Sequence, residues 1–181
     1  MAARKRNKER DRLAFSLASS LPDSGGGYEI SAAFTAPERR RILGEWTIAE
    51  HLVDGVPYIE LFSRTAVRDA ALLDGVYISI YDFREYVCVK RVRIRGLVEL
   101  AGGRVEYLYS MSLAISWELG RGYLTVRPEL GYQSTSLDGK MAAVKELPSS
   151  GERTRVGYRF EGEALVLEDG ADFKRLTREA E

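Results

Sequence analysis

The sequence predicts an all-β protein: an antiparallel meander barrel, with short helices near the first strand and a basic N-terminal arm. The main observation is that every odd position from Val105 to Leu119 is apolar, a period of two that is typical of strands. In addition, glycine-containing turns separate short segments rich in Val, Ile, Leu and Tyr after Gly75. Sequential strands joined by short turns form meander barrels or sandwiches, and we expect the barrel.

The N-terminal segment differs in charge from the rest of the chain. The 181 residues carry 27 basic and 27 acidic side chains, but residues 1–12 have a net charge of +4, so the remainder has −4. Residues 13–21 predict a short helix, and the Gly-rich stretch up to residue 27 predicts a flexible linker. We therefore expect an arm and linker over 1–27 and one barrel domain over 28–181. The acidic body argues against a nucleic-acid partner.

Two helices are expected around the first strand. Thr35 as cap and Pro37 in the first turn predict a helix that ends at Gly44. The strand that follows, 45–53, would place Trp46, Ile48, Glu50 and Leu52 on one face. A second helix is predicted from Ser63 to Leu73, ended by Asp74-Gly75.

The remaining strands follow from composition and turns. Gly96 is expected to end one strand, and residues 134–153 are predicted to form a long polar loop with one helical turn. The alternating run would span roughly 50 Å if straight, so we expect a bend near Ser110–Ser112. The predicted strands are 76–83, 86–94, 97–101, 104–119, 123–130, 155–160, 164–169 and 171–178.

Two short motifs carry a family resemblance. Gly44-Glu45-Trp46 enters the first strand after a helix, and Phe173-Lys174-Arg175 lies at the last strand. Together with the hairpins at 116–129 and 157–170, these motifs resemble bacterial lipocalin-like domains of the calycin group over about residues 36–178. The resemblance implies a carrier barrel in which Trp46 packs under a late arginine, Arg175 or alternatively Arg178.

The alternating face supplies the main candidate ligand-binding residues. Tyr107, Tyr109, Met111 and Trp117 have amphipathic or polarisable side chains that suit the wall of a cavity. The same residues could instead fill a solid barrel, because an eight-stranded barrel can be packed or hollow. Small residues on the opposite face, such as Ser110 and Ser112, would let a partner lie flat against the wall.

Arg91, Arg93 and Arg95 share one face of their strand and allow two interpretations. Arg91 and Arg93 are candidates for an interior anion site that binds a carboxylate. Alternatively, all three lie on the solvated outer face, and Lys90 points inward or sits at a bulge. The cost of desolvating three arginines favours the outer face.

Little in the sequence suggests catalysis. There is one cysteine, Cys88, and one histidine, His51, and no motif for a nucleotide, a metal or an activated serine is present. We expect Cys88 to be a buried small side chain and His51 a structural hydrogen bonder. No catalytic residue, cofactor or metal is therefore predicted.

Three functional hypotheses follow. The first is a non-catalytic binding module for a small apolar or amphipathic ligand. The second is an assembly subunit with a solid barrel, whose basic arm over 1–27 docks on an acidic protein partner or a membrane surface. The third is an enzyme that uses the mouth of the barrel, which a loss of turnover on substitution of His51 would support. With no transmembrane segment expected, the sequence predicts a cytoplasmic protein, or an envelope protein if the N-terminus acts as an export signal.

Overall fold

The computed structural model describes residues 32–65 and 70–178. The chain divides into two units, Met1–Arg41 and Ile42–Glu181. Helix α2 (Ala32–Ile42) begins before Thr35, so Thr35 and Pro37 lie inside it, and the predicted cap and first turn are wrong. The predicted helix over 13–21 and the arm over 1–27 lie outside the described residues, and the domain limits stay predictions.

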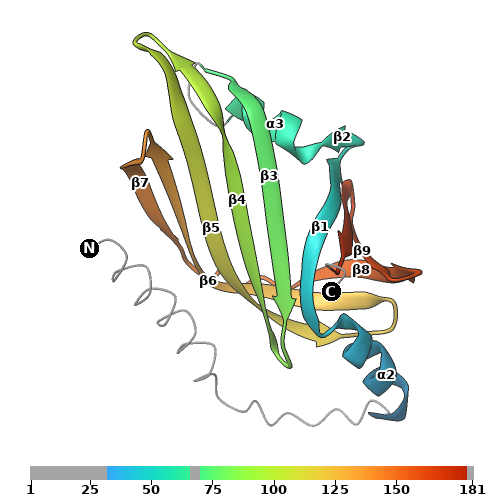
Figure 1. Ribbon diagram of the computed structural model, residues 1–181. Coiled ribbons are helices and arrows are strands. Elements are labelled where there is room, and N and C mark those ends of the chain that lie inside the picture. The colour runs from blue at the N-terminus through green and yellow to red at the C-terminus, as the bar shows by residue number, and fades with distance from the viewer. Residues whose placement is uncertain (1–31, 66–69, 179–181) are drawn as a thin grey trace. The chain divides into compact units, whose positions relative to one another are not determined.

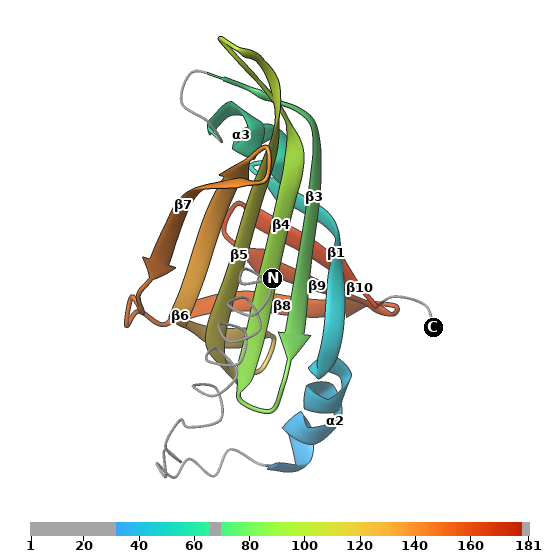
Figure 2. The ribbon, with the colours of Figure 1, turned by 60° about the vertical axis from the view of Figure 1, so that its left-hand side comes forward.

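Eight antiparallel strands close into a barrel, as Figures 1 and 2 show. The strands follow chain order, and β1 closes the ring because it pairs with β3 on one side and with β10 on the other. This arrangement confirms the predicted meander barrel. Its strands are β1 (Gly44–Val53), β3 (Leu72–Phe83), β4 (Val87–Leu100), β5 (Gly103–Leu119), β6 (Tyr123–Leu137), β8 (Thr154–Glu161), β9 (Ala164–Asp169) and β10 (Asp172–Thr177).

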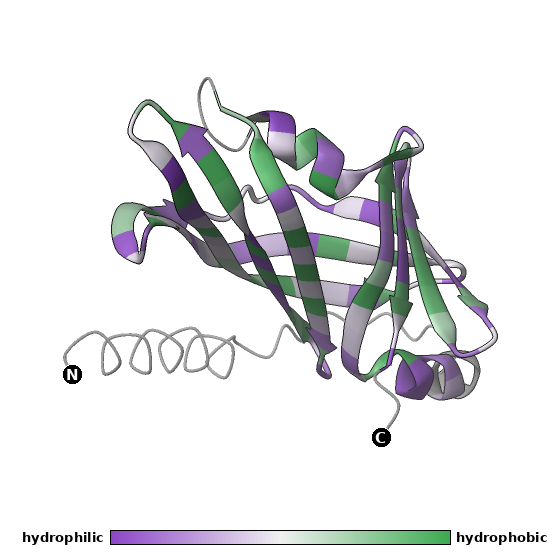
Figure 3. Cartoon of the chain, turned by 45° about the horizontal axis from the view of Figure 1, so that its top comes forward, coloured by the Kyte–Doolittle hydropathy of each residue, from purple (hydrophilic) through white to green (hydrophobic). Residues whose placement is uncertain are grey.

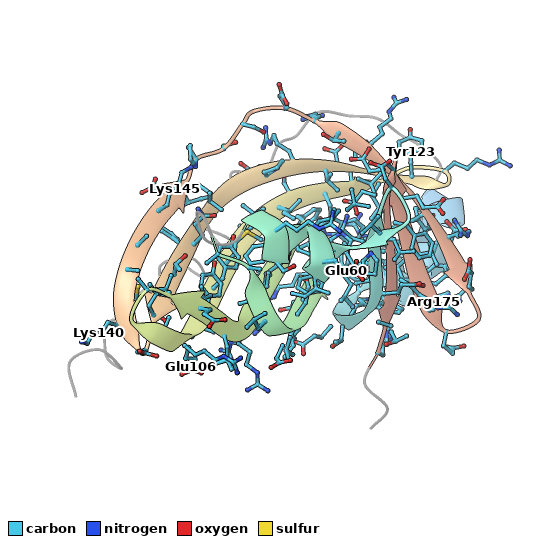
Figure 4. All side chains as sticks on the ribbon, turned by 90° about the horizontal axis from the view of Figure 1, so that it is seen from above. Glu60, Glu106, Tyr123, Lys140, Lys145 and Arg175 are labelled. Carbon is cyan, nitrogen blue, oxygen red and sulfur yellow. The ribbon has the colours of Figure 1, made fainter. Side chains whose placement is uncertain are left out.

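Part of the sheet continues beyond the closed ring. Strand β6 pairs with β8 through Tyr123–Val126, but its later residues pair with β7 (Lys140–Leu147) instead. Strands β3 to β7 therefore form an open extension of the barrel wall. The short strand β2 (Val56–Pro57) and helix α3 (Tyr58–Thr65) follow β1, and α3 lies beside the upper end of β3 (Figures 1 and 2) and overlaps the ring in the view from above (Figure 4).

The predicted polar loop over 134–153 is wrong in its first part. Strand β6 runs to Leu137 and returns as β7 through a two-residue turn at Asp138 and Gly139, whose φ angles are 45° and 72°. Positive φ at both positions is the signature of a tight hairpin turn. The Ser- and Thr-rich sequence looked like a loop because these strands lie partly or wholly in solvent, which removes the apolar alternation.

Three other boundaries differ from the expectations. The second helix is α3, which begins at Tyr58, and Leu72 already belongs to β3. Strand β4 passes through Gly96 without a break. The glycine serves packing there: a Cβ would lie 2.7 Å from Leu72 Cδ1, so only glycine leaves room for the Leu72 side chain. Strand β5 is continuous, and the irregularity falls in its pairing with β6, between Leu113 and Ile115.

The interior contains two apolar clusters. One lies in the closed part of the barrel around Trp46, Phe83 and Trp117, and the other lies under α3 around Ile94 and Tyr107. Figure 3 shows the alternating hydrophilic and hydrophobic bands along β3 and β4 that produce this inward burial. No helix among residues 32–65 and 70–178 is long and apolar enough to cross a membrane.

Candidate functional site

A bulge in β1 brings the single histidine into the barrel. The pairing with β10 shifts between Ile48 and Glu50, so that His51 lies opposite Lys174 on the inner face. The predicted uniform alternation, with Glu50 on the Trp46 face, is therefore wrong. The pairing of β1 with β10 is regular before and after the bulge. The shift in register therefore comes from one extra residue, Ala49.

His51 is held at both ring nitrogens. Its Nε2 lies 2.8 Å from Asp172 Oδ1 and its Nδ1 lies 2.9 Å from Tyr77 Oη. Burial raises the pKa of Tyr77, so its hydroxyl stays protonated and can donate to Nδ1. The neutral tautomer with its proton on Nε2 then satisfies the whole chain from Tyr77 to Asp172. Tyr58 stacks on the imidazole at 4.4 Å between ring centroids.

Asp172 is shared between two basic side chains. Lys174 Nζ donates to the second carboxylate oxygen, while His51 occupies the first. Burial raises the pKa of Asp172, but the hydrogen bonds from His51 and Lys174 and the charge of Lys174 outweigh it and lower the pKa to about 2. Asp172 is therefore ionised and already engaged at physiological pH.

Lys90 is a second basic side chain on the inner face. It lies between the buried Cys88 and Val92 on β4, with its ammonium 5.4 Å from the centroid of the Tyr81 ring. Within the described part of the chain it makes no ion pair and no hydrogen bond. Burial, together with the charge of Lys174, lowers the pKa of Lys90 to about 8. The residue as a whole keeps some exposure to solvent.

Ser79 adds a hydroxyl to the same face. It lies on β3 opposite Val92, diagonally from Lys90, and the residue is fully buried. Among the described residues its Oγ makes no hydrogen bond of good distance and angle, although it lies near the hydroxyls of Tyr77 and Tyr81 and opposes the rise in their pKa values. A buried hydroxyl without a well-formed hydrogen bond costs free energy, which a ligand oxygen would recover. Lys90, Ser79, His51, Tyr77, Asp172 and Lys174 together are called the polar layer below.

The residues predicted to bind a ligand divide into two groups. Tyr107 and Trp117 are each only 2% exposed and belong to the two apolar clusters, and Trp117 Nε1 donates to the Arg84 carbonyl oxygen at 2.8 Å. Tyr109 and Met111 are partly exposed on the inner face, and Tyr109 Oη donates to Gln133 Oε1 at 3.1 Å. Only Tyr109 and Met111 are thus placed where a ligand could reach them.

The arginines of β4 lie outside the barrel. Arg91, Arg93 and Arg95 are exposed, and Arg91 pairs with Glu45 at 2.6 Å. An interior anion site made from Arg91 and Arg93 is therefore excluded by their position. Their alternation with the inward Lys90 follows directly from the period of the strand.

The arginine over Trp46 is Arg178, the alternative to Arg175. Its guanidinium carbon lies 4.4 Å from the ring centroid, and its Nη2 donates to the Leu43 carbonyl oxygen at 2.8 Å. Arg175 instead lies on the outer face of β10, where it reaches Glu161 at 3.3 Å. The expectation that Arg175 packs over Trp46 is wrong, because the alternation along β10 turns the odd-numbered side chains outward. Arg178 lies just after the end of β10 and takes that position instead.

Sequence reasoning missed most of the polar layer. Lys90 was recognisable as the one charged residue of even number among Cys88, Val92 and Ile94, but Ser79 and Asp172 gave no signal. The inward position of His51 depends on the bulge in β1, and no local sequence motif predicts that bulge.

Comparisons with protein-family models, with curated proteins and with solved structures found no significant match to this chain. The lipocalin resemblance therefore stays a prediction from the sequence. In the part of the chain that is described, no cluster of three or more His, Cys, Asp or Glu side chains could hold a metal ion.

Proposed function

We propose that the protein is a binding module whose barrel interior takes a small amphipathic molecule. The observation that carries the proposal is a polar layer in which, among the described residues, the Lys90 ammonium has no ion pair and the Ser79 hydroxyl has no well-formed hydrogen bond. Partly exposed apolar side chains lie beside it. An amphipathic ligand would satisfy the polar groups with one end and cover apolar surface with the other.

The inner face of the extension supplies the apolar contact. Tyr109 and Met111 lie on β5 beside Tyr58 and Phe62 of α3, and all four are only partly buried. The rings of Phe62 and Tyr109 lie 5.4 Å apart, so the helix and the sheet offer one continuous aromatic surface.

His51 does not support the enzyme hypothesis. Both of its ring nitrogens are hydrogen-bonded to Tyr77 and Asp172, which agrees with the structural role that we predicted for this histidine. A non-catalytic role remains our prediction.

A second candidate function, protein interaction, rests on β7. Met141 is 62% exposed and Val144 is 48% exposed, and Tyr132 beside them on β6 is 37% exposed. Among the strands of residues 32–65 and 70–178, β7 pairs only with β6, so within this part of the chain its other edge offers unpaired backbone groups to a partner strand.

Native mass spectrometry of the purified protein, with solvent extraction of any retained molecule, tests the binding proposal. We expect a fluorescent fatty-acid probe to bind, and Tyr109→Ala with Met111→Ala to weaken it at least several-fold. Ser110→Ala, on the outer face of the same strand, is the matched control and should leave binding unchanged. A clean mass and no probe binding at micromolar concentration would contradict the proposal.

A further inference from the structure

We infer that the ligand carries an acidic head group with a single negative charge, and that Lys90 and Ser79 bind this group inside the barrel. This inference rests on the proposed function and names the class of ligand. A carboxylate is the simplest group of this kind, since it accepts from an ammonium and a hydroxyl at once.

The lysines of the polar layer outnumber its carboxylates. Lys90 and Lys174 face a single carboxylate, Asp172. Asp172 is already hydrogen-bonded at both oxygens, and its charge offsets only part of the lowering of the Lys90 pKa that burial and Lys174 cause. An unpaired buried cation is costly, and one negative charge from a ligand would remove that cost.

The register places the two binding groups within reach of one head group. Lys90 lies opposite Tyr81 across β3 and β4, and Ser79 lies opposite Val92, the next inward residue. Such diagonal neighbours on one face of a sheet are about 7–8 Å apart, and the long lysine side chain spans that separation. An oxygen between them can accept from both the ammonium and the hydroxyl.

The same register gives the direction of the apolar chain. Beyond Val92, the next inward row across the sheet is Tyr77, Ile94 and Tyr109, which leads to the cluster under α3. On the opposite side, Tyr81 and Phe83 are closely packed and buried. The ligand chain therefore runs from Lys90 toward α3, past Met111.

Paired ligands that differ only in the head group test this inference. We would titrate dodecanoate and dodecanol by calorimetry into the full-length protein and into Lys90→Met. We expect the wild type to bind the acid at least ten-fold more tightly than the alcohol, and Lys90→Met to lose that preference. Lys145→Met, which removes an exposed lysine on β7, is the control and should keep it (Figure 4).

Two further variants keep the test independent of folding defects. Lys90→Arg retains the charge and should retain part of the preference, while Ser79→Ala should weaken the acid several-fold and leave the alcohol unchanged. Equal binding of acid and alcohol by the wild type, or an undiminished preference in Lys90→Met, would overturn the inference but leave the proposed function standing. Failure of both compounds to bind would contradict the proposed function itself.

Discussion

Lys90 and Tyr81 face each other across β3 and β4, with the ammonium 5.4 Å from the centroid of the tyrosine ring. The π face of an aromatic ring attracts a cation but compensates only part of its lost hydration. Tyr81 itself is 5% exposed, and burial raises the pKa of its hydroxyl well above the ordinary value. The pair therefore tolerates a cation inside the barrel without neutralising it, which leaves the ammonium available to an anion.

Lys90→Met should stabilise the protein free of ligand. The pKa of Lys90 falls from 10.5 to about 8, which means that the fold disfavours the cation. At about 1.4 kcal/mol for each pKa unit, its removal should add on the order of 1–3 kcal/mol at pH 7. Urea denaturation measures this, with Lys145→Met expected to change stability by less than about 0.5 kcal/mol.

The pH dependence of wild-type stability gives a second check on Lys90. Because the pKa of Lys90 is lower in the folded state, the unfolded chain binds more protons between about pH 8 and 10.5. This residue should therefore make stability rise with pH across that window, and Lys90→Met should lack the rise. A Lys90→Met protein less stable than the wild type would argue against a desolvated ammonium.

Asp172 should contribute stability that is lost in acid. The pKa of Asp172 is lowered from 3.8 to about 2, so its contribution is complete above about pH 4 and disappears as the pH falls through 2. The carboxylate is 35% exposed, so solvent screening limits the effect to about 1 kcal/mol. Denaturation from pH 5 to 2 should show a steeper loss for wild type than for Asp172→Asn, whereas Asp169→Asn should follow wild type.

Arg178→Ala should destabilise the barrel by about 1 kcal/mol, because it removes the cation over Trp46 and a hydrogen bond to the Leu43 carbonyl. Arg175→Ala removes only a surface contact with Glu161 and should cost less than about 0.5 kcal/mol. Thermal unfolding with tryptophan fluorescence distinguishes the two. Equal effects would mean that Arg178 does not stabilise Trp46.

Gly96→Ala should cost about 1–3 kcal/mol, because the new Cβ would lie 2.7 Å from both Leu72 Cδ1 and the Leu73 carbonyl oxygen. The backbone oxygen cannot move aside as a side chain can. Gly102→Ala, which meets nothing within 4 Å, is the control and should change stability by less than about 0.5 kcal/mol. Urea denaturation of both variants measures the difference, and equal stabilities would show that Leu72 does not pack against Gly96.

The architecture was predictable where one face of a strand is buried. The alternation from Val105 to Leu119 matches β5, and the hairpins after residue 154 match β8 to β10, because burial imposes a period of two. The β6–β7 hairpin was not predictable in this way, since every residue of β7 from Lys140 to Glu146 is exposed. Helix α3 begins at Tyr58 and not at the predicted Ser63. Its position follows from packing against β3 and β5 and not from a capping motif in the sequence.

The candidate site was predictable only in part. Tyr109 and Met111 were selected from alternation and lie on the accessible inner face. Lys90 could be placed inward by the same alternation, but its lack of a counter-ion depends on Asp172, which is 82 positions away in the sequence and bound to His51 and Lys174. Long-range pairing of this kind, and the bulge that turns His51 inward, leave no local signal.

Binding of an acidic head group inside the barrel depends most directly on the protonation of Lys90 in the protein free of ligand. NMR titration of the protein labelled at the lysine ε-carbons would measure it, with the Lys90 signal identified by its absence from the Lys90→Met spectrum. We predict that this signal titrates with a pKa of about 8 and moves to a higher pKa when dodecanoate is bound. A Lys90 pKa near 10.5 in the free protein, unchanged by the acid, would contradict the account.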